Sequence, residues 1–366
     1  MPAGAAHGTL GVMAYDSCAP ARLGSLCSGI GGLELGLSQV LSTELAWQSE
    51  IHPAASQVLA RQFPGVPNLG DLVAVDWAGV EPVDIVCFGF PCQNLSLAWA
   101  GEGIEDGTKS RLWFSCLRAV RALRPRVVFL ENVSSLVGSR KGRDFTIVQS
   151  GLAQAGYDTF WLCLPAAAVG APHRRERLFL IAYFPDRRDW VAGLTRPQVA
   201  GPALPPVPRL LPTPVANDDG KQPHAHVAAK NRYDSSKRTV ITSLAVMGIQ
   251  AAFTGLWAPK LLPRDRGDST VPMPEDKVDL GVYLPAVRRW EKVLGRPAPC
   301  STDGPAHSTN FVEWMQGYAD GWTAGISRSA RLHCLGNSVV PQQAAMAARL
   351  LLQELAGTTS LSRAVA

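Results

Sequence analysis

Residues 22–50 read RLGSLCSGIGGLELGLSQVLSTELAWQSE, and this stretch decides the fold. An apolar run over residues 22–28 leads into a glycine-rich turn, and a helical pattern follows over residues 33–41. A second strand-like run ends at Glu50. Glycines let a backbone approach a ligand closely, and a helix amino end favours a negative group. A nucleoside cofactor and a simple tight turn both fit. The strict dinucleotide pattern G-x-G-x-x-G fails, because Glu34 holds the third glycine's place.

The alternation of strands and helices continues beyond this unit. The run DIVCFGF at residues 84–90 and the run RVVFLENV at residues 126–133 are nearly continuous apolar segments, as expected for strands buried on both faces. Strands separated by helical crossovers predict an α/β fold with a doubly wound, mostly parallel sheet. The further predicted strands are residues 159–164 and 177–184, and the predicted helices are residues 54–63, 112–123, 144–155, 311–318 and 341–355.

The composition changes after Pro185. From there to about residue 308, proline, glycine and charged residues are frequent, and only residues 240–249 and 282–294 are periodic. A structureless loop of this length inside one domain is improbable, so we predict a second, loop-rich domain.

Composition limits the class of protein. The chain of 366 residues is 46% hydrophobic and 18% charged, which supplies a sizeable core and excludes global disorder. The net charge of +5 permits a nucleic-acid partner without demonstrating one. The eight cysteines form no Cys-x-x-Cys pair, so we expect no metal site and reduced thiols. No signal-peptide pattern and no apolar run near the ~20 residues of a membrane span occur, so we expect a soluble, cytoplasmic protein.

Two reactive side chains follow predicted strands. Cys92 comes two residues after the run at residues 84–90, at the sheet edge where open α/β folds bind ligands. It is either a nucleophile or a buried apolar cysteine, the fate we expect for Cys87, Cys116 and Cys163. Glu131 follows an apolar run, where a carboxyl group is costly unless it is paired or used; a turn carboxylate is the other interpretation.

Two further motifs complete the set. In PHRRER (residues 172–177), alternate residues of an extended segment face one side, so His173, Arg175 and Arg177 would point together. Such a row binds phosphates or bases, or is simply a solvated charge cluster. GNSVVP (residues 336–341) leads into the last helix and has no role that its own residues indicate.

In this order, the glycine turn, GFPCQNLS (residues 89–96), ENV (residues 131–133), PHRRER and GNSVVP resemble the DNA (cytosine-5)-methyltransferase family. The resemblance covers about residues 23–184 and 311–355. It implies a catalytic S-adenosylmethionine-binding domain at residues 1–185, a target-recognition domain at 186–308 and a C-terminal segment, 309–366, that returns to the catalytic domain.

The resemblance implies a role for each matching residue. The glycines would line the methionine end of S-adenosylmethionine, Glu50 would bind the ribose hydroxyls, Ile51 would lie against the adenine and Asp71 would meet its amino group. The full set of implied cofactor residues is Leu26, Gly29, Gly31, Gly32, Glu50, Ile51, Asp71, Leu72, Leu112, Asn337 and Ser338.

For catalysis, the resemblance makes Cys92 the nucleophile and Glu131 the acid that faces the target ring. Arg175 and Arg177 would hold the cytosine and the catalytic loop. A thiolate added to cytosine C6 pushes electron density to C5, which is otherwise a poor nucleophile. Since C5 is inaccessible inside a duplex, the cytosine must leave the stack.

The resemblance also implies a monomer on double-stranded DNA, near the nucleoid, with no direct complex with any cognate restriction endonuclease. An RNA cytosine methyltransferase and a non-catalytic DNA-binding relative remain alternatives. Ser25, Cys27, His173 and Lys109 depart from the family's usual Asp, Phe, Gln and Arg. The candidate DNA contacts are Gln93, Lys109, Arg111, His173, Lys221, Lys230, Arg232, Lys237 and Arg238.

Overall fold

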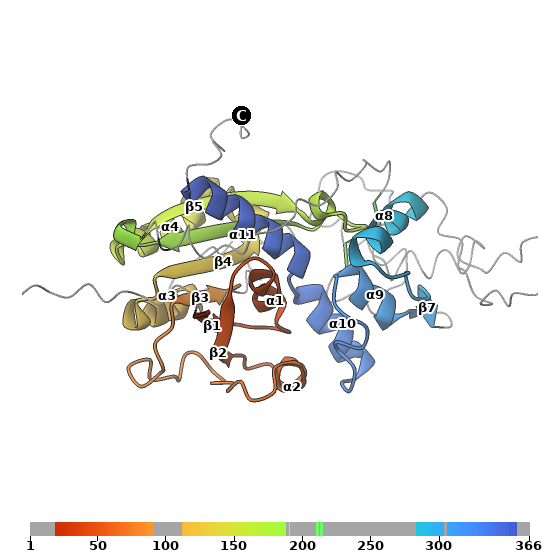
Figure 1. Cartoon of the computed structure of the whole chain (residues 1–366), viewed down its shortest axis with the longest axis horizontal. Helices are drawn as coiled ribbons and strands as arrows, with labels where there is room; N and C mark the ends of the chain where they lie inside the picture. Colours follow the sequence, from red (N-terminus) through yellow and green to blue (C-terminus); the bar gives the residue numbers. More distant parts are fainter. Residues whose placement is uncertain are drawn as a thin grey trace, which may run out of the picture.

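The structure is a computed structural model of the chain. It describes residues 19–90, 112–187, 190, 210–211, 213–214, 283–303 and 306–356. Figure 1 shows a central sheet with helices on both faces and a group of helices beyond one end of it.

Six strands form the main sheet, in the order β2-β1-β3-β4-β6-β5. Strand β1 pairs in parallel with β2 and β3, and β3 pairs in parallel with β4. Strand β6 runs antiparallel to both of its neighbours, β4 and β5. The strands are β1 (Ala21–Leu26), β2 (Thr43–Ser49), β3 (Ile85–Phe88), β4 (Val127–Val133), β5 (Asp158–Pro165) and β6 (Glu176–Tyr183), and a separate pair is β7 (Thr302–Asp303) with β8 (Ala306–His307).

Eight α-helices accompany these strands in the described part of the chain. The α-helices are α1 (Gly32–Ser38), α2 (Pro53–Gln62), α3 (Leu112–Leu123), α4 (Arg143–Gln154), α8 (Leu284–Leu294), α9 (Thr309–Met315), α10 (Arg328–Asn337) and α11 (Pro341–Leu355), and the short 3-10 turns are η2 (Ser134–Leu136), η3 (Ser139–Gly142), η4 (Ala166–Val169) and η5 (Pro185–Arg187).

Two apolar layers sandwich the sheet because successive strand residues face opposite sides. On β3, Val86 and Phe88 pack toward α3 and α4, where Trp113 is fully buried. Ile85 and Cys87 face the other layer, made by α1 and α11. Burial on both faces explains why these strands lack a polar alternation.

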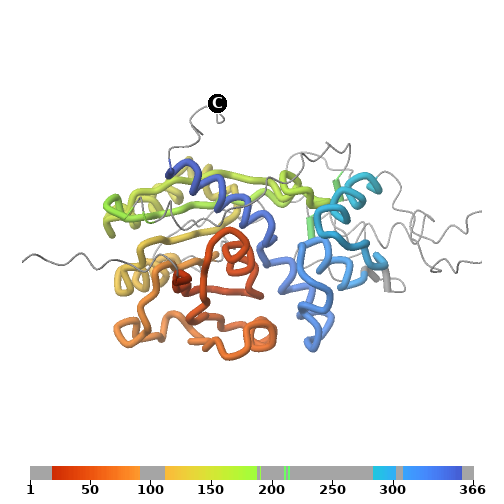
Figure 2. Tube along the Cα trace, viewed as in Figure 1, coloured from red at the N-terminus to blue at the C-terminus, as the bar shows by residue number. Residues whose placement is uncertain are grey.

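The C-terminal segment packs against the first helix, as Figure 2 shows where blue α11 crosses beside red α1. The approach is close at Gly36, where a Cβ atom would lie 2.6 Å from that of Ala344 and 2.7 Å from the carbonyl oxygen of Pro341. A side chain larger than glycine's cannot fit there. The two ends of the described chain therefore share one core.

The predicted fold class is confirmed, and the structure refines or corrects some of the predictions. The structure contains the strands and helices predicted between residues 22 and 184, with bounds that differ by at most three residues, and α3 and α11 match exactly. The direction of β6 makes the sheet mixed. Helix α10 was not predicted. The expectation that Cys163 is buried is wrong, because it is exposed on β5. The helical pattern at residues 240–249 lies outside the described residues.

Within the described ranges, none of the helices has the length and apolar character needed to cross a membrane.

Candidate functional site

The glycine turn adopts a conformation that few sequences allow. Three of its residues have positive φ angles: Cys27 at 50°, Gly29 at 57° and Gly31 at 86°. Glycine adopts such angles without steric cost, whereas a cysteine does so rarely. Gly31 is the N-cap of α1, and its N–H group donates to the carbonyl oxygen of Ser28 at 3.0 Å. Residues 27–32, hereafter the glycine loop, are thus wound tightly over the carboxyl end of β1.

Glu50 holds the glycine loop with its carboxylate. The Gly29 N–H group donates to one oxygen at 2.8 Å, and the His52 N–H group donates to the other at 2.7 Å. Asn68 fixes the Glu50 backbone through its side-chain amide. The sequence predicted a ribose contact for Glu50 and did not predict this link to the glycine loop.

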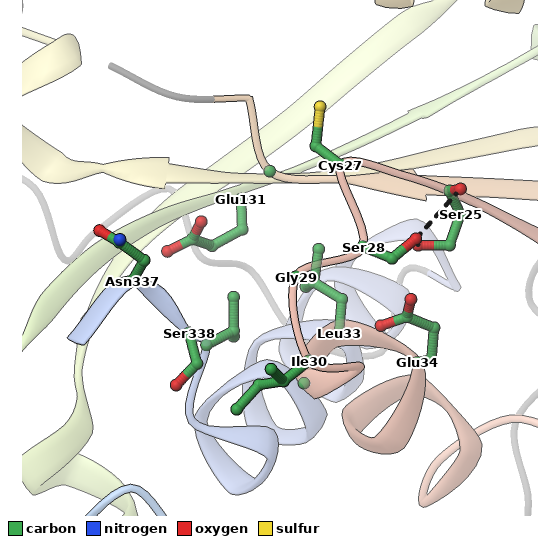
Figure 3. Close-up of a pocket in the computed structure, with 13 residues that line it drawn as sticks. Ser25, Cys27, Ser28, Gly29, Ile30, Leu33, Glu34, Glu131, Asn337 and Ser338 are labelled. Carbon is green, nitrogen blue, oxygen red and sulfur yellow. Dashed lines mark hydrogen bonds between the residues drawn. The ribbon is translucent and has the colours of Figure 1, made fainter. Parts of the chain in front are cut away.

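A cavity opens beside the glycine loop (Figure 3). It brings together residues from the turn, from the end of β4 and from the junction of α10 with α11, which are far apart in the sequence. Among the predicted site residues, Gly29, Gly32, Glu131, Asn337 and Ser338 line it. Lining residues that were not predicted are Ser25, Cys27, Ser28, Ile30, Leu33, Glu34, Gly89 and Val339.

Other predicted cofactor residues are not among those that line the cavity. The side chains of Leu26 and Leu72 are buried in the core beneath, and Leu112 packs against the same core. Ile51 is 69% exposed, which is unusual for an isoleucine and leaves its side chain available to a ligand. Asp71 is exposed, and its Oδ1 accepts from the Val73 N–H group.

Glu131 is the buried acid of the cavity, and it is 8% exposed. The Arg177 Nε lies 2.9 Å from its Oε1. Burial raises the pKa of the Glu131 carboxyl, although the positive charges of Arg177 and Arg175 partly oppose this shift. A Cβ atom on Gly89, at the end of the neighbouring strand, would meet Glu131 Oε2 at 3.0 Å. The carboxyl group therefore lies directly beside the start of the segment that carries Cys92.

Arg175 is buried, and its guanidinium contacts the backbone of the GNSVVP motif. It donates to the Gly336 carbonyl oxygen at 3.1 Å and also to that of Ser338. Burial lowers the pKa of Arg175 to about 9. These contacts connect PHRRER to GNSVVP, and they position Asn337 and Ser338 at the cavity.

His173 is fully buried, and its Nε2 lies 3.0 Å from the Met315 carbonyl oxygen. Since a carbonyl only accepts, Nε2 carries the proton of a neutral ring. Burial lowers the pKa of His173 to about 3, with a further contribution from the charge of Arg175. This placement argues against the DNA contact predicted for His173.

A buried neutral histidine makes stability depend on pH. With a folded pKa of about 3 against an ordinary 6.5, its contribution is present above pH 6.5 and is lost as the pH falls toward 3. His173→Gln keeps an N–H donor for Met315 and removes the titration. Between pH 7 and pH 5, we expect the free energy of unfolding of the wild type to fall by about 2 kcal/mol more than that of His173→Gln. Urea denaturation at both pH values measures this difference, and parallel pH profiles would contradict it.

Asn132, the middle residue of ENV, has a structural role that the sequence did not show. Its Nδ2 donates to the Phe90 carbonyl oxygen at 3.1 Å, and its Oδ1 accepts from the Val133 N–H group at 2.8 Å. The side chain therefore fixes the end of β3 to the end of β4. Its position between Glu131 and a strand end was the available signal.

Cys92 and eight of the predicted DNA contacts lie outside the described residues. These contacts are Gln93, Lys109, Arg111, Lys221, Lys230, Arg232, Lys237 and Arg238. A search of the described residues for clusters of histidine, cysteine and carboxylate side chains finds none that could hold a metal ion.

Comparison with solved structures places the fold among methyltransferases. A putative DNA modification methyltransferase encoded within an E. coli prophage superposes with a TM-score of 0.53, at 17% identity, over 91% of this chain and 99% of that one. The S. pombe Dnmt2 methyltransferase superposes with a TM-score of 0.51, at 13% identity, over 92% and 99% of the two chains. At these identities the likeness concerns the fold alone.

Sequence comparison is more specific. The family model of the C-5 cytosine-specific DNA methylase matches residues 21–240, which is more than half of the chain. The chain belongs to this family. It is 32% identical to the type II methyltransferase M.Bsp6I of Bacillus sp. over 44% of this chain and 52% of that protein. It is 36% identical to M.NlaX of Neisseria lactamica over 43% and 50%. The chain thus spans about half the length of the curated relatives it matches.

Proposed function

We propose that this protein transfers a methyl group from S-adenosylmethionine to carbon 5 of a cytosine in double-stranded DNA. The observation that carries the proposal is the convergence of the glycine loop, Glu131 and Asn337–Ser338 on one cavity, in a chain of the C-5 cytosine-specific DNA methylase family. Transfer of a labelled methyl group to duplex DNA, compared with transfer to tRNA, tests it. Labelled tRNA and unlabelled DNA would refute the DNA substrate.

The residues around the cavity fit the cofactor. A Cβ atom on Gly29 would have no described neighbour within 4 Å, so Gly29 faces open space, whereas Gly32 lets the start of α1 pack closely on the Tyr318 hydroxyl and the Val339 carbonyl oxygen. We assign the methionine end to Gly29, Gly31, Gly32, Asn337 and Ser338. Glu50 would bind the ribose, Ile51 would lie against the adenine and Asp71 would meet its amino group, with Leu26, Leu72 and Leu112 supporting them. S-adenosylmethionine, when bound, supplies an electrophilic methyl group.

The chain's own residues would activate the cytosine. The Cys92 thiolate adds to C6, and the electron pair moves toward C5, which takes the methyl group. Glu131 in its protonated form donates to ring N3 and stabilises the charge that develops there. Its burial supports this role, because burial favours the neutral acid. Loss of the C5 proton to a base then expels Cys92 and restores the aromatic ring.

Arg177 would influence the protonation of Glu131, because its positive charge lowers the pKa of that carboxyl group. Its contact with Oε1 supplies positive charge at the edge of the target site, while Arg175 holds the neighbouring turn. We therefore assign Arg177 to the developing charge on the cytosine and Arg175 to the positioning of Asn337 and Ser338.

The domain division belongs to the same proposal. Residues 1–185 with 309–366 would form the catalytic unit, and residues 186–308 would read the DNA sequence. The shared core of α1 and α11 supports the return of the C-terminal segment. A target cytosine would leave the duplex stack to reach Glu131, at a cost of a few kcal/mol.

Replacing Glu50 with alanine should weaken cofactor binding at least about tenfold, because a charged acceptor of two N–H groups is lost together with the ribose contact. DNA affinity should change by less than about twofold. Calorimetry with S-adenosylmethionine measures the first effect and a gel-shift titration the second. Glu44→Ala is the matched control, since Glu44 is exposed on the same strand, β2. Equal cofactor affinity in wild type and Glu50→Ala would refute the assigned role.

A further inference from the structure

The segment between α9 and α10 lies against the glycine loop, although no motif pointed to it. Trp322 donates its indole N–H to the Ile30 carbonyl oxygen at 2.9 Å, between residues 292 positions apart in the chain. Ile30 lines the cavity, and its side chain is 1% exposed. A hydrogen bond of this kind fixes the orientation of the peptide group whose oxygen it binds.

The same peptide group is held from its other side. The N–H of Gly31 belongs to the Ile30–Gly31 peptide, and it donates to the Ser28 carbonyl oxygen at 3.0 Å. Rotation of this peptide would break both hydrogen bonds together. Gly29 and Gly31 have positive φ angles, and glycine adopts negative φ angles about as readily. The glycine loop can therefore adopt other conformations, and fixing this peptide selects one of them.

Trp322 is itself fixed by its surroundings. Buried Glu313 accepts from the N–H groups of Gly321 at 2.7 Å and Thr323 at 2.6 Å, which flank the tryptophan. The indole ring packs at 5.6 Å from the Tyr318 ring and meets Phe63 edge-on at 6.0 Å.

Helix α2 also holds the segment, through two side chains at its carboxyl end. The Arg61 guanidinium donates to the Gly321 carbonyl oxygen at 3.1 Å and to those of Trp322 and Ala324. Gln62 donates to the Trp322 carbonyl oxygen at 2.8 Å. Trp322 is therefore presented to the glycine loop by a rigid frame rather than by a free loop.

We propose that Trp322 is a positioning residue that holds the glycine loop in its cofactor-binding conformation through the Ile30 carbonyl. This inference rests on the proposed function, because the ligand of the loop is taken to be S-adenosylmethionine. The indole contacts the loop backbone and acts through it on the cofactor.

The test is Trp322→Phe, which keeps an aromatic ring and removes the N–H donor. We expect the Kd for S-adenosylmethionine to rise about 3- to 10-fold, the range of one lost hydrogen bond. The KM for the cofactor should rise with it, while kcat at saturating cofactor stays within about twofold, as for a residue that affects binding alone. Arg61→Gln, on an exposed side chain, should weaken binding in the same direction.

Trp314→Phe is the matched control. Trp314 is fully buried on α9, and its indole nitrogen has no hydrogen-bond partner among the described residues. Its replacement should lower the thermal midpoint and leave cofactor affinity unchanged. Equal weakening by Trp314→Phe, or unchanged affinity in Trp322→Phe, would overturn the proposal.

Hydrogen–deuterium exchange without cofactor separates this inference from the proposed function. The amides of residues 28–32 should exchange faster in Trp322→Phe than in wild type and Trp314→Phe. If wild-type protein fails to bind S-adenosylmethionine, the proposed function is refuted while this comparison still decides the loop contact. Equal exchange in all three proteins would overturn the positioning role.

Discussion

Replacing Cys92 with alanine should reduce methyl transfer below detection while cofactor binding persists. The proposal assigns the attack on C6 to the Cys92 thiolate, and without addition at C6 the C5 carbon does not attack a methyl sulfonium at a useful rate. Cofactor affinity should be unchanged, because the cavity beside the glycine loop is built from other elements. Transfer of labelled methyl groups and calorimetry measure the two quantities.

Two described contacts bring the residues just before Cys92 close to the end of β4, which carries Glu131. Asn132 binds the Phe90 carbonyl oxygen, two residues before Cys92. A Cβ atom on Gly89 would lie 3.0 Å from Glu131 Oε2. Gly89, which precedes the Cys92 segment, therefore lies beside the Glu131 carboxyl group.

The control for this prediction is Cys163→Ser, since Cys163 is exposed on β5 and lies outside the cavity. That variant should retain wild-type activity. A duplex containing 5-fluorocytosine supplies a second measurement, because fluorine at C5 blocks the elimination that releases the thiol. Wild-type protein and Cys163→Ser should remain covalently attached, and Cys92→Ala should not. Attachment of Cys92→Ala would show that another residue is the nucleophile.

Replacing Glu131 with glutamine should lower kcat by about 10²- to 10⁴-fold, the usual contribution of a general acid. Glutamine keeps the shape and a hydrogen-bond donor but cannot transfer a proton. Single-turnover methyl transfer with saturating DNA and cofactor measures the effect. Glu44→Gln, an exposed change of the same type on β2, should leave the rate unchanged. A rate within twofold of wild type in Glu131→Gln would remove the acid role.

The pH dependence of the reaction carries the same information. The pKa of Glu131 is raised by burial, so the protonated acid persists to a higher pH than an ordinary glutamate allows. As the pH rises through this raised pKa, the acid is lost and the single-turnover rate should fall. Glu131→Gln should lack this limb of the profile. If the rate of Glu131→Gln also falls at high pH as in the wild type, another group causes that fall.

The sequence predicted the elements well where burial imposes a pattern. A nearly continuous apolar run such as residues 84–90 is typical of a strand covered on both faces, and α11 carries a clear helical period. Strand direction leaves no such trace, so antiparallel β6 could not be distinguished from a parallel strand. Helix α10 (RSARLHCLGN) is polar and short of large apolar residues, and it is held by contacts with α2 and α9 that no local pattern encodes.

For the site, local reasoning could place Glu131 at a strand end but could not pair it with Arg177. That pairing depends on the antiparallel register of β4 and β6, in which Glu131 lies opposite Phe179 and Val133 opposite Arg177. The resemblance to the family assigned Asn337 and Ser338 to cofactor binding, and both residues line the cavity. Trp322 and Ile30 are 292 positions apart in the chain, so their contact could not be predicted from the sequence and is visible only in the folded structure.

Bisulfite sequencing of plasmid DNA from cells that express this protein, beside the Cys92→Ala variant, tests the central claim most directly. The account predicts protected cytosines within one short recurring sequence in the wild-type sample and none in the variant sample. Fully converted cytosines in both samples, from cells in which the wild-type protein is folded and binds S-adenosylmethionine, would contradict it.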